Sequence, residues 1–185
     1  MLYATIVQTE DELYQILDLQ KENLRGTISN NEEKEQGFVT VAHTYESLKQ
    51  MHQLQPSVIV KDGDVLAGYA LVMTKECSAL IPELISMFEH FDDIYYKEKP
   101  LNDYSFYIMG QVCVSKPYRG QGVFGMLYQK HREWLQPMFD FVVTEIATRN
   151  KRSIRAHEKV GFATIHTYTD DLDEWAVVVW DWRNN

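Results

Sequence analysis

The sequence predicts an α/β fold in which helices cover both faces of a mixed β-sheet. Segments with the pattern of strands alternate with segments of helical periodicity along most of the chain. Apolar runs on either side of Asp62-Gly63-Asp64 indicate an antiparallel β-hairpin. Strands that alternate with helices, together with a hairpin, imply a mixed sheet between two helical layers.

The length of 185 residues fits one domain, residues 1–185, because two domains would leave neither half enough apolar surface for its own core. No apolar run approaches the roughly 20 residues that span a bilayer, and the start lacks the pattern of a secretion signal. Cys77 and Cys113 show no CxxC spacing and no nearby histidine cluster. We therefore expect a soluble, cytoplasmic protein with no metal and no membrane partner.

The first half of the chain has clear local signals. Thr9 and Glu12 form a capping box, and Pro56 stops a later helix. The expected elements are a strand from Tyr3 to Gln8, a helix from Thr9 to about Lys21, an exposed polar loop or short helix from Arg25 to Gln36, a helix from Tyr45 to Leu54, and hairpin strands from Ser57 to Lys61 and from Val65 to Met73.

The second half alternates more regularly, apart from the stretch from Lys75 to Asp103. That stretch suggests a short helix beginning near Ile81 and then an acidic, tyrosine-rich excursion. The later elements are a strand from Tyr104 to Val114, a helix from Gly122 to Gln136, a strand from Phe141 to Ala147, a helix from Ser153 to Val160, a strand from Phe162 to Thr169 and a strand from Trp175 to Asp181. The last strand is apolar on both faces, so it is either central or buried by a second copy.

A glycine turn lies between the strand that ends at Val114 and the helix that follows. It reads Arg119-Gly120-Gln121-Gly122-Val123-Phe124-Gly125. Glycines let backbone N–H groups converge on a ligand, and the helix N-terminus adds a partial positive charge. With the charge of Arg119, this pattern predicts a phosphate site, although glycines that merely allow a tight helix entry are an alternative.

The same turn fits the dinucleotide fingerprint, since Gly120, Gly122 and Gly125 have the GxGxxG spacing and Asp140 lies about 20 residues on. In that fold the first glycine follows the strand almost directly, and the acidic residue ends the next strand. Here five residues separate Val114 from Gly120, and Asp140 precedes its strand. The dinucleotide interpretation therefore fits less well.

These residues resemble the GNAT superfamily of acyl-CoA N-acyltransferases, whose pyrophosphate loop reads Arg/Gln-x-x-Gly-x-Gly/Ala. The turn from Arg119 fills the pattern except at Phe124, where Gly or Ala is usual. The segment from Asn150 to Phe162 is similar to the family's Asn-x-x-Ser/Ala, Tyr and Gly-Phe segment, with Ser153 in place and His157 at the tyrosine position. The resemblance covers about Tyr104 to Phe162.

The resemblance implies a mostly antiparallel central sheet of about seven strands whose central strands splay apart around acetyl-CoA. Gly110 inside a strand indicates the bulge that would start the splay. The implied cofactor-binding residues are Val112, Cys113, Val114, Arg119, Gly120, Gln121, Gly122, Val123, Phe124, Gly125, Asn150 and Ser153.

The implied reaction is direct attack of an amine on a thioester, which requires two proton transfers. His157 is the leading candidate for the acid that protonates the thiolate, the alternative being a helix histidine packed against Phe162 or solvent. Glu145, in an otherwise apolar strand, is the candidate base, the alternative being an ion pair at the strand end. Cys113 is read as a small core residue rather than a nucleophile.

The expected function is therefore N-acetyl transfer to a primary amine of a small molecule or peptide. A non-catalytic acyl-CoA-binding module is the alternative, and a dinucleotide-binding redox domain is a third. The formal charge of −9 repels nucleic acid and suits a cationic acceptor, while the cluster of Lys151, Arg152 and Arg155 is explained as readily by CoA. We expect the acceptor between the N-terminal helices and the Lys75 to Asp103 excursion, and a homodimer is an open option.

Overall fold

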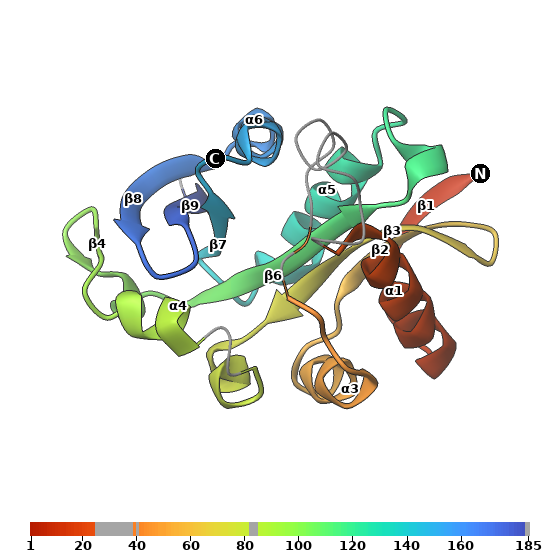
Figure 1. Ribbon diagram of the computed structural model, residues 1–185, viewed down its shortest axis with the longest axis horizontal. Helices are drawn as coiled ribbons and strands as arrows, with labels where there is room; N and C mark the ends of the chain where they lie inside the picture. The colour runs from red at the N-terminus through yellow and green to blue at the C-terminus, as the bar shows by residue number, and fades with distance from the viewer. Residues whose placement is uncertain (25–38, 40, 82–84, 184–185) are drawn as a thin grey trace.

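The structure is a computed structural model that describes residues 1–24, 39, 41–81 and 85–183. A twisted seven-stranded sheet runs through it in the order β1-β2-β3-β6-β7-β9-β8 (Figure 1). All neighbouring strands are antiparallel except β6 and β7, which are parallel. The strands are β1 (Leu2–Ile6), β2 (Val58–Asp62), β3 (Val65–Met73), β6 (Phe106–Val114), β7 (Phe141–Ala147), β8 (Ala163–Thr169) and β9 (Glu174–Asp181). The predicted mixed, mostly antiparallel sheet is confirmed.

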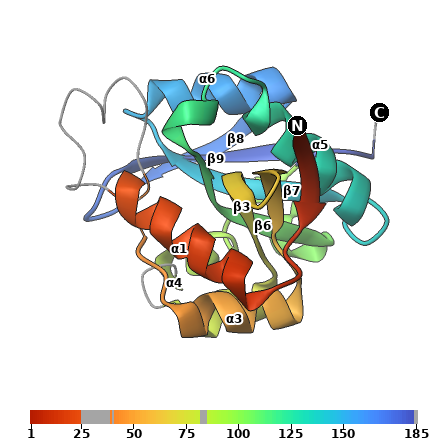
Figure 2. The same cartoon turned by 90° about the vertical axis from the view of Figure 1, so that its right-hand side faces the viewer.

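Helices cover both faces of the sheet (Figure 2), so that prediction is also confirmed. Helices α1 (Glu10–Asn23), α3 (Tyr45–Leu54) and α4 (Ile85–His90) lie on one face, and α5 (Val123–Leu135) and α6 (Lys151–Val160) lie on the other. Short 3-10 helices are η1 (Lys75–Ala79), η3 (Leu101–Asp103) and η4 (Lys116–Tyr118). Within the described ranges no helix is both long and apolar enough to cross a bilayer.

Alternation along the strands divides the core into two layers. Ile59 of β2 packs in the cluster that contains the apolar side chains of α1 and α3, whereas its neighbours Val58 and Val60 pack in the cluster with α5. Since successive strand side chains point to opposite faces, one apolar strand serves both layers. This explains why the inner strands read as nearly continuous apolar runs.

The capping box predicted at the start of α1 is present. The Thr9 side chain accepts from the Glu12 amide, and the Glu12 carboxylate accepts from the Thr9 amide. Glu12 also forms an ion pair with Lys61 at 2.8 Å, across from α1 to β2. A single carboxylate thus fixes both the helix entry and the packing of the helix on the sheet.

The sequence did not predict the small hairpin of β4 (Tyr95–Tyr96) and β5 (Lys99–Pro100). Contacts with the main sheet stabilise this hairpin, because the Tyr96 hydroxyl and the Lys97 ammonium both donate to the Asp181 carboxylate of β9. The short helix expected near Ile81 corresponds to α4 (Ile85–His90), and residues 82–84 of that expectation lie outside the described residues. The expectation for Arg25 to Gln36 lies outside the described residues.

Strand β9 lies between β7 and β8, with buried residues from Ala176 to Trp180. Of the two explanations for its apolar faces, the central position is therefore the one that the structure shows. Helices on both sides account for its burial without a second copy.

The central strands splay apart after a short parallel contact. Residues Phe106–Ile108 of β6 pair with Phe141–Val143 of β7, and the pairing stops there. The register between β3 and β6 shifts around Gly110, which is the bulge expected from the sequence. A Cβ at Gly110 would lie 2.1 Å from the Met73 sulfur, so a larger residue there would require the buried Met73 side chain to move. The predicted splay is confirmed.

Candidate active site

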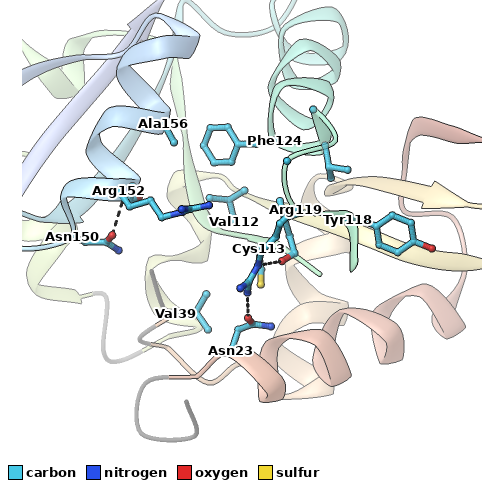
Figure 3. A pocket seen from close by; sticks show the side chains of 15 residues that line it. Asn23, Val39, Val112, Cys113, Tyr118, Arg119, Phe124, Asn150, Arg152 and Ala156 are labelled. Carbon is cyan, nitrogen blue, oxygen red and sulfur yellow. Dashed lines mark hydrogen bonds between the residues drawn. The ribbon is translucent and has the colours of Figure 1, made fainter. Parts of the chain in front are cut away.

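A cavity of about 310 Å³ opens between the N-terminus of α5, the end of β6 and the start of α6 (Figure 3). We call it the central cavity. Ten of the twelve residues expected to bind the cofactor line it, namely Val112, Cys113, Val114, Arg119, Gly120, Gly122, Val123, Phe124, Asn150 and Ser153. The glycine turn, the splayed strand and the second family segment therefore meet at one place.

The glycine turn opens the N-terminus of α5 toward this cavity. Gly120 and Gly122 have φ values of 77° and 81°, a region that favours glycine, and Gly122 is the N-cap of the helix. Among the described residues no side chain caps this end, and the amides of a first helical turn have no acceptor within their own helix. A Cβ at either glycine would enter open space. This is the geometry of an anion site.

Arg119 ties the turn to two other elements as it lines the cavity. Its Nε donates to the Val114 carbonyl at 3.2 Å, and its Nη2 donates to Asn23 Oδ1 at 2.8 Å (Figure 3). Asn23 ends α1, and its carbonyl accepts from the Val39 amide. Arg119 therefore brings its charge to the cavity and fixes the turn against α1.

Beyond Ile108, the edge of β6 that faces β7 is unpaired, and every second residue directs its backbone N–H and C=O groups toward the splay. The Ser115 amide donates to the Ala67 carbonyl of β3. Because hydrogen-bonded pairs alternate along an antiparallel ladder, Cys113 also directs its backbone at β3, while Val112 and Val114 direct theirs at the splay. Burial raises the pKa of the Cys113 thiol to about 12, which leaves it a poor nucleophile.

Asn150 caps α6 beside the cavity. Its Oδ1 accepts from the Ser153 amide at 3.1 Å. The Nδ2 group, which donates and does not take part in this bond, remains at the cavity wall. Arg152 extends from the same helix toward Val112 (Figure 3). The start of α6 therefore presents amide and guanidinium donors to the same cavity as the glycine turn.

Two further spaces share lining residues with the central cavity and continue it on different sides. A cavity of about 90 Å³ between the splayed strands, the splay cavity, shares Val112, Asn150 and Ser153 with it and is also lined by Glu145 and His157. A groove of about 510 Å³ between the two helices, the α5–α6 groove, shares Phe124, Arg152 and Ala156 with it. The three spaces form one continuous path.

Glu145, on β7, lines the splay cavity. Both carboxylate oxygens lie 2.9 Å from the Tyr168 hydroxyl, and no cation pairs with the carboxylate in the described part of the chain. Burial raises the pKa of Glu145 to about 8; the Tyr168 hydrogen bond opposes this rise, and the charge of Asp170 adds to it. The partner is therefore a phenol, not the ion pair that the sequence left open.

His157 is fully buried and neutral rather than poised as an acid. Its Nδ1 lies 2.8 Å from the Ser153 carbonyl, which only accepts, so Nδ1 carries the proton and Nε2 accepts from the Tyr128 hydroxyl at 2.6 Å. Burial lowers the pKa of His157 to about 4. The edges of Phe124 and Phe162 pack on the ring. In this arrangement the ring is neutral and not an imidazolium, and its contact with Phe162 fits the packing alternative that the sequence left open.

Two buried histidines are expected to make the protein unstable in acid. His131 resembles His157, because it contacts the Tyr107 hydroxyl at 2.8 Å and burial lowers its pKa to about 4. Each folded pKa lies below the unfolded value of 6.5, so stability is lost as pH falls from about 6.5 toward 4. The loss approaches about 3 kcal/mol for each histidine. The free energy of unfolding, measured with urea across this pH range, should depend less steeply on pH in His157→Phe than in the wild type. The control His166→Ala, at an exposed position, should show the same pH dependence as the wild type.

Five further residues line the central cavity, namely Asn23, Val39, Tyr118, Arg152 and Ala156; of these the sequence pointed only to Arg152, as part of the basic cluster explained by CoA. Arg152 and Ala156 lie within one or two turns of Asn150 on α6, and helical spacing identifies them. Asn23 and Val39 come together only in the folded chain, where the Val39 amide donates to the Asn23 carbonyl. No motif in the sequence predicts this contact.

Two expected residues do not line the central cavity. The exposed Gln121 side chain donates to the Pro117 carbonyl, and Gly125 faces the α5–α6 groove.

The dinucleotide interpretation does not fit the structure. Asp140 lies before β7, where its carboxylate accepts from the Ser105 amide. The sheet around it is mostly antiparallel, whereas that fold needs parallel strands on both sides of the site.

A mostly antiparallel sheet whose central strands separate beside an uncapped, glycine-opened helix defines the N-acetyltransferase fold class. The profile of the acetyltransferase (GNAT) family matches residues 11–162, and the chain belongs to this family. The resemblance seen in the sequence is thereby confirmed. No curated protein sequence matches the chain significantly.

Solved structures share the fold over nearly the whole chain. The ribosomal-protein-S18-alanine N-acetyltransferase of Escherichia coli has a TM-score of 0.61 and 12% identity, covering 97% of this chain and 92% of its own. The yncA protein of Salmonella typhimurium with acetyl-CoA has a TM-score of 0.63 and 11% identity, covering 100% and 95%. The NatC complex bound to Gag peptide and CoA has a TM-score of 0.65 and 10% identity, covering 97% and 98%. At such identities the likeness shows the fold alone.

Proposed function

We propose that the protein transfers an acetyl group from acetyl-CoA to a primary amine of a small molecule or peptide. The observation that carries this proposal is the continuous path from an anion site at the glycine turn to a carboxyl group of raised pKa in the splay cavity. Family membership supports acetyl transfer, and two of the similar structures hold CoA or acetyl-CoA.

The residues along the path fit CoA in chemical order. The uncapped amides from Gly122 onward suit the pyrophosphate. The backbone groups of Val112 and Val114, with the Asn150 amide, suit the amides of the pantetheine arm, as an added strand would. The narrow splay cavity suits the acyl end. Acetyl-CoA, as substrate, supplies an activated thioester.

Glu145 is the base that we assign to the amine. An ammonium has no lone pair for attack, so a neighbouring group has to take its proton. A carboxyl group whose pKa is raised to about 8 holds a proton more firmly than a solvated one, which suits this transfer. Activity should therefore rise with pH through about 8, as Glu145 ionises. His157 acts as a positioning residue that joins α6 to α5 through Tyr128.

Thiol release from acetyl-CoA tests this function directly. The protein is incubated with acetyl-CoA and a panel containing alkyl diamines, peptides with free N-termini and lysine-containing N-acetylated peptides. We expect thiol release with at least one of these amines. Tight acetyl-CoA binding without release on any acceptor would instead support the acyl-CoA-binding module, which the neutral, buried His157 favours as the second candidate.

Replacing Tyr168 by phenylalanine should shift the pH dependence of turnover. Tyr168 stabilises the ionised form of Glu145, so its loss raises the pKa of that carboxyl further, by about one unit for a hydrogen bond to a charged group. The other titratable groups at this place, Asp170 and the His90 ring stacked 4.0 Å from Tyr168, remain. We expect lower turnover at neutral pH and recovery at higher pH.

The control is Tyr96→Phe, which removes a tyrosine–carboxylate hydrogen bond at the remote Asp181. Its pH profile should match that of the wild type. An unchanged profile in Tyr168→Phe would show that the phenol does not act on the base.

A further inference from the structure

The α5–α6 groove is basic, although the chain as a whole is acidic. Arg152, Arg155 and Lys159 line it, and its lining contains no carboxylate from the part of the chain that the structure describes. The formal charge of the protein is −9, so three cations in one groove are a local exception. Such a groove favours an anionic ligand by charge complementarity.

The cations belong to one helix face. Positions 152, 155 and 159 recur at spacings of three and four, so their side chains project on the same side of α6. Arg155 and Lys159 are exposed, and neither forms an ion pair with another described residue. Their charges are therefore not neutralised by a carboxylate in the part of the chain that the structure describes.

The order of the three spaces indicates which part of a ligand reaches this groove. On the proposed function, the pyrophosphate lies at the glycine turn and the acyl end lies in the splay cavity. The α5–α6 groove is the continuation on the other side, since it shares Phe124, Arg152 and Ala156 with the central cavity. The portion of CoA beyond its pyrophosphate is an adenosine that carries a 3′-phosphate.

We propose that the α5–α6 groove binds the 3′-phosphate of CoA through Arg155 and Lys159, and thereby selects free acyl-CoA as the donor. A phosphomonoester carries nearly two negative charges at neutral pH, and guanidinium and ammonium groups both bind it by charge-assisted hydrogen bonds. Donors that lack this phosphate, such as dephospho-CoA or a phosphopantetheine arm attached to a carrier protein, lose these contacts. The inference rests on the proposed function.

Calorimetric titration with CoA and with dephospho-CoA tests the groove without any acceptor amine. The wild type should bind CoA roughly tenfold more tightly than dephospho-CoA, and added salt should narrow this difference. The double variant Arg155→Ala/Lys159→Ala should bind both ligands equally, with the affinity that the wild type has for dephospho-CoA. The control Lys130→Ala removes a cation from α5 that pairs with Glu133, and it should keep the wild-type preference.

The outcomes separate the two proposals. Equal affinity of the wild type for both ligands would overturn the 3′-phosphate site and leave the acetyltransferase proposal standing. A preference for CoA that persists in the double variant would also overturn the site. Failure of the wild type to bind either ligand would defeat the proposed function itself. Retained binding of dephospho-CoA by the double variant shows that it is folded.

Discussion

Replacing Glu145 by glutamine is expected to lower turnover by about 10²- to 10⁴-fold, the usual contribution of a general base. Glutamine has the same shape and still accepts from the Tyr168 hydroxyl through its amide oxygen. It cannot take a proton at any working pH, so the rise of activity through about pH 8 should disappear as well. Steady-state kinetics across the pH range measure both effects, and acetyl-CoA affinity should stay near that of the wild type.

The same substitution should stabilise the fold, which a purely structural carboxylate would not do. The folded pKa of about 8 lies above the usual 4.5, so the folded state binds more protons and stability falls as pH rises from 4.5 to about 8. A neutral glutamine avoids this loss, which amounts to at most about 3 kcal/mol at pH 7. Thermal unfolding at neutral pH should show a higher midpoint for Glu145→Gln.

Glu12→Gln is the matched control, because Glu12 is a buried carboxylate whose partner is a cation. Despite its burial, the pKa of Glu12 is lowered by the Lys61 ammonium and the amides of the capping box. Removing this charge should destabilise the fold by about 1–3 kcal/mol and leave turnover per folded molecule unchanged. Wild-type turnover in Glu145→Gln would remove Glu145 from the mechanism.

Features encoded by neighbouring residues were predictable from the sequence. The capping box at Thr9 and the bulge at Gly110 each rest on a local backbone preference. The glycine turn rests on the same physics, and its residues do line a cavity at a helix N-terminus. Such signals need no knowledge of which strands become neighbours.

Features set by strand order were not predictable. Tyr168 reaches Glu145 because β9 lies between β7 and β8 and places the two side chains across it, and no sequence pattern specifies that order. The environment of His157 is a second case. The sequence shows that it replaces a tyrosine of the family pattern, but only the packing of α6 on α5 shows that a phenol, Tyr128, donates to it and that the ring is buried.

Replacing Gly122 by valine is expected to weaken CoA binding by about 100-fold or more, from the loss of several hydrogen bonds to a charged ligand. The new side chain would extend into open space of the central cavity, where it would cover the uncapped amides of α5. The φ of 81° also strains a β-branched residue, so the fold itself should lose some stability.

Gly63→Val distinguishes these two effects. Gly63 also has a left-handed φ, of 59°, and also faces open space, but it lies in the hairpin turn between β2 and β3, and not in the cavity lining. Both variants should therefore unfold at lower temperature, while only Gly122→Val should lose CoA in calorimetric titration. Wild-type CoA affinity in Gly122→Val would mean that the amides at the start of α5 do not hold the diphosphate. An equal loss of affinity in Gly63→Val would mean that backbone strain, rather than occlusion of the anion site, causes the defect.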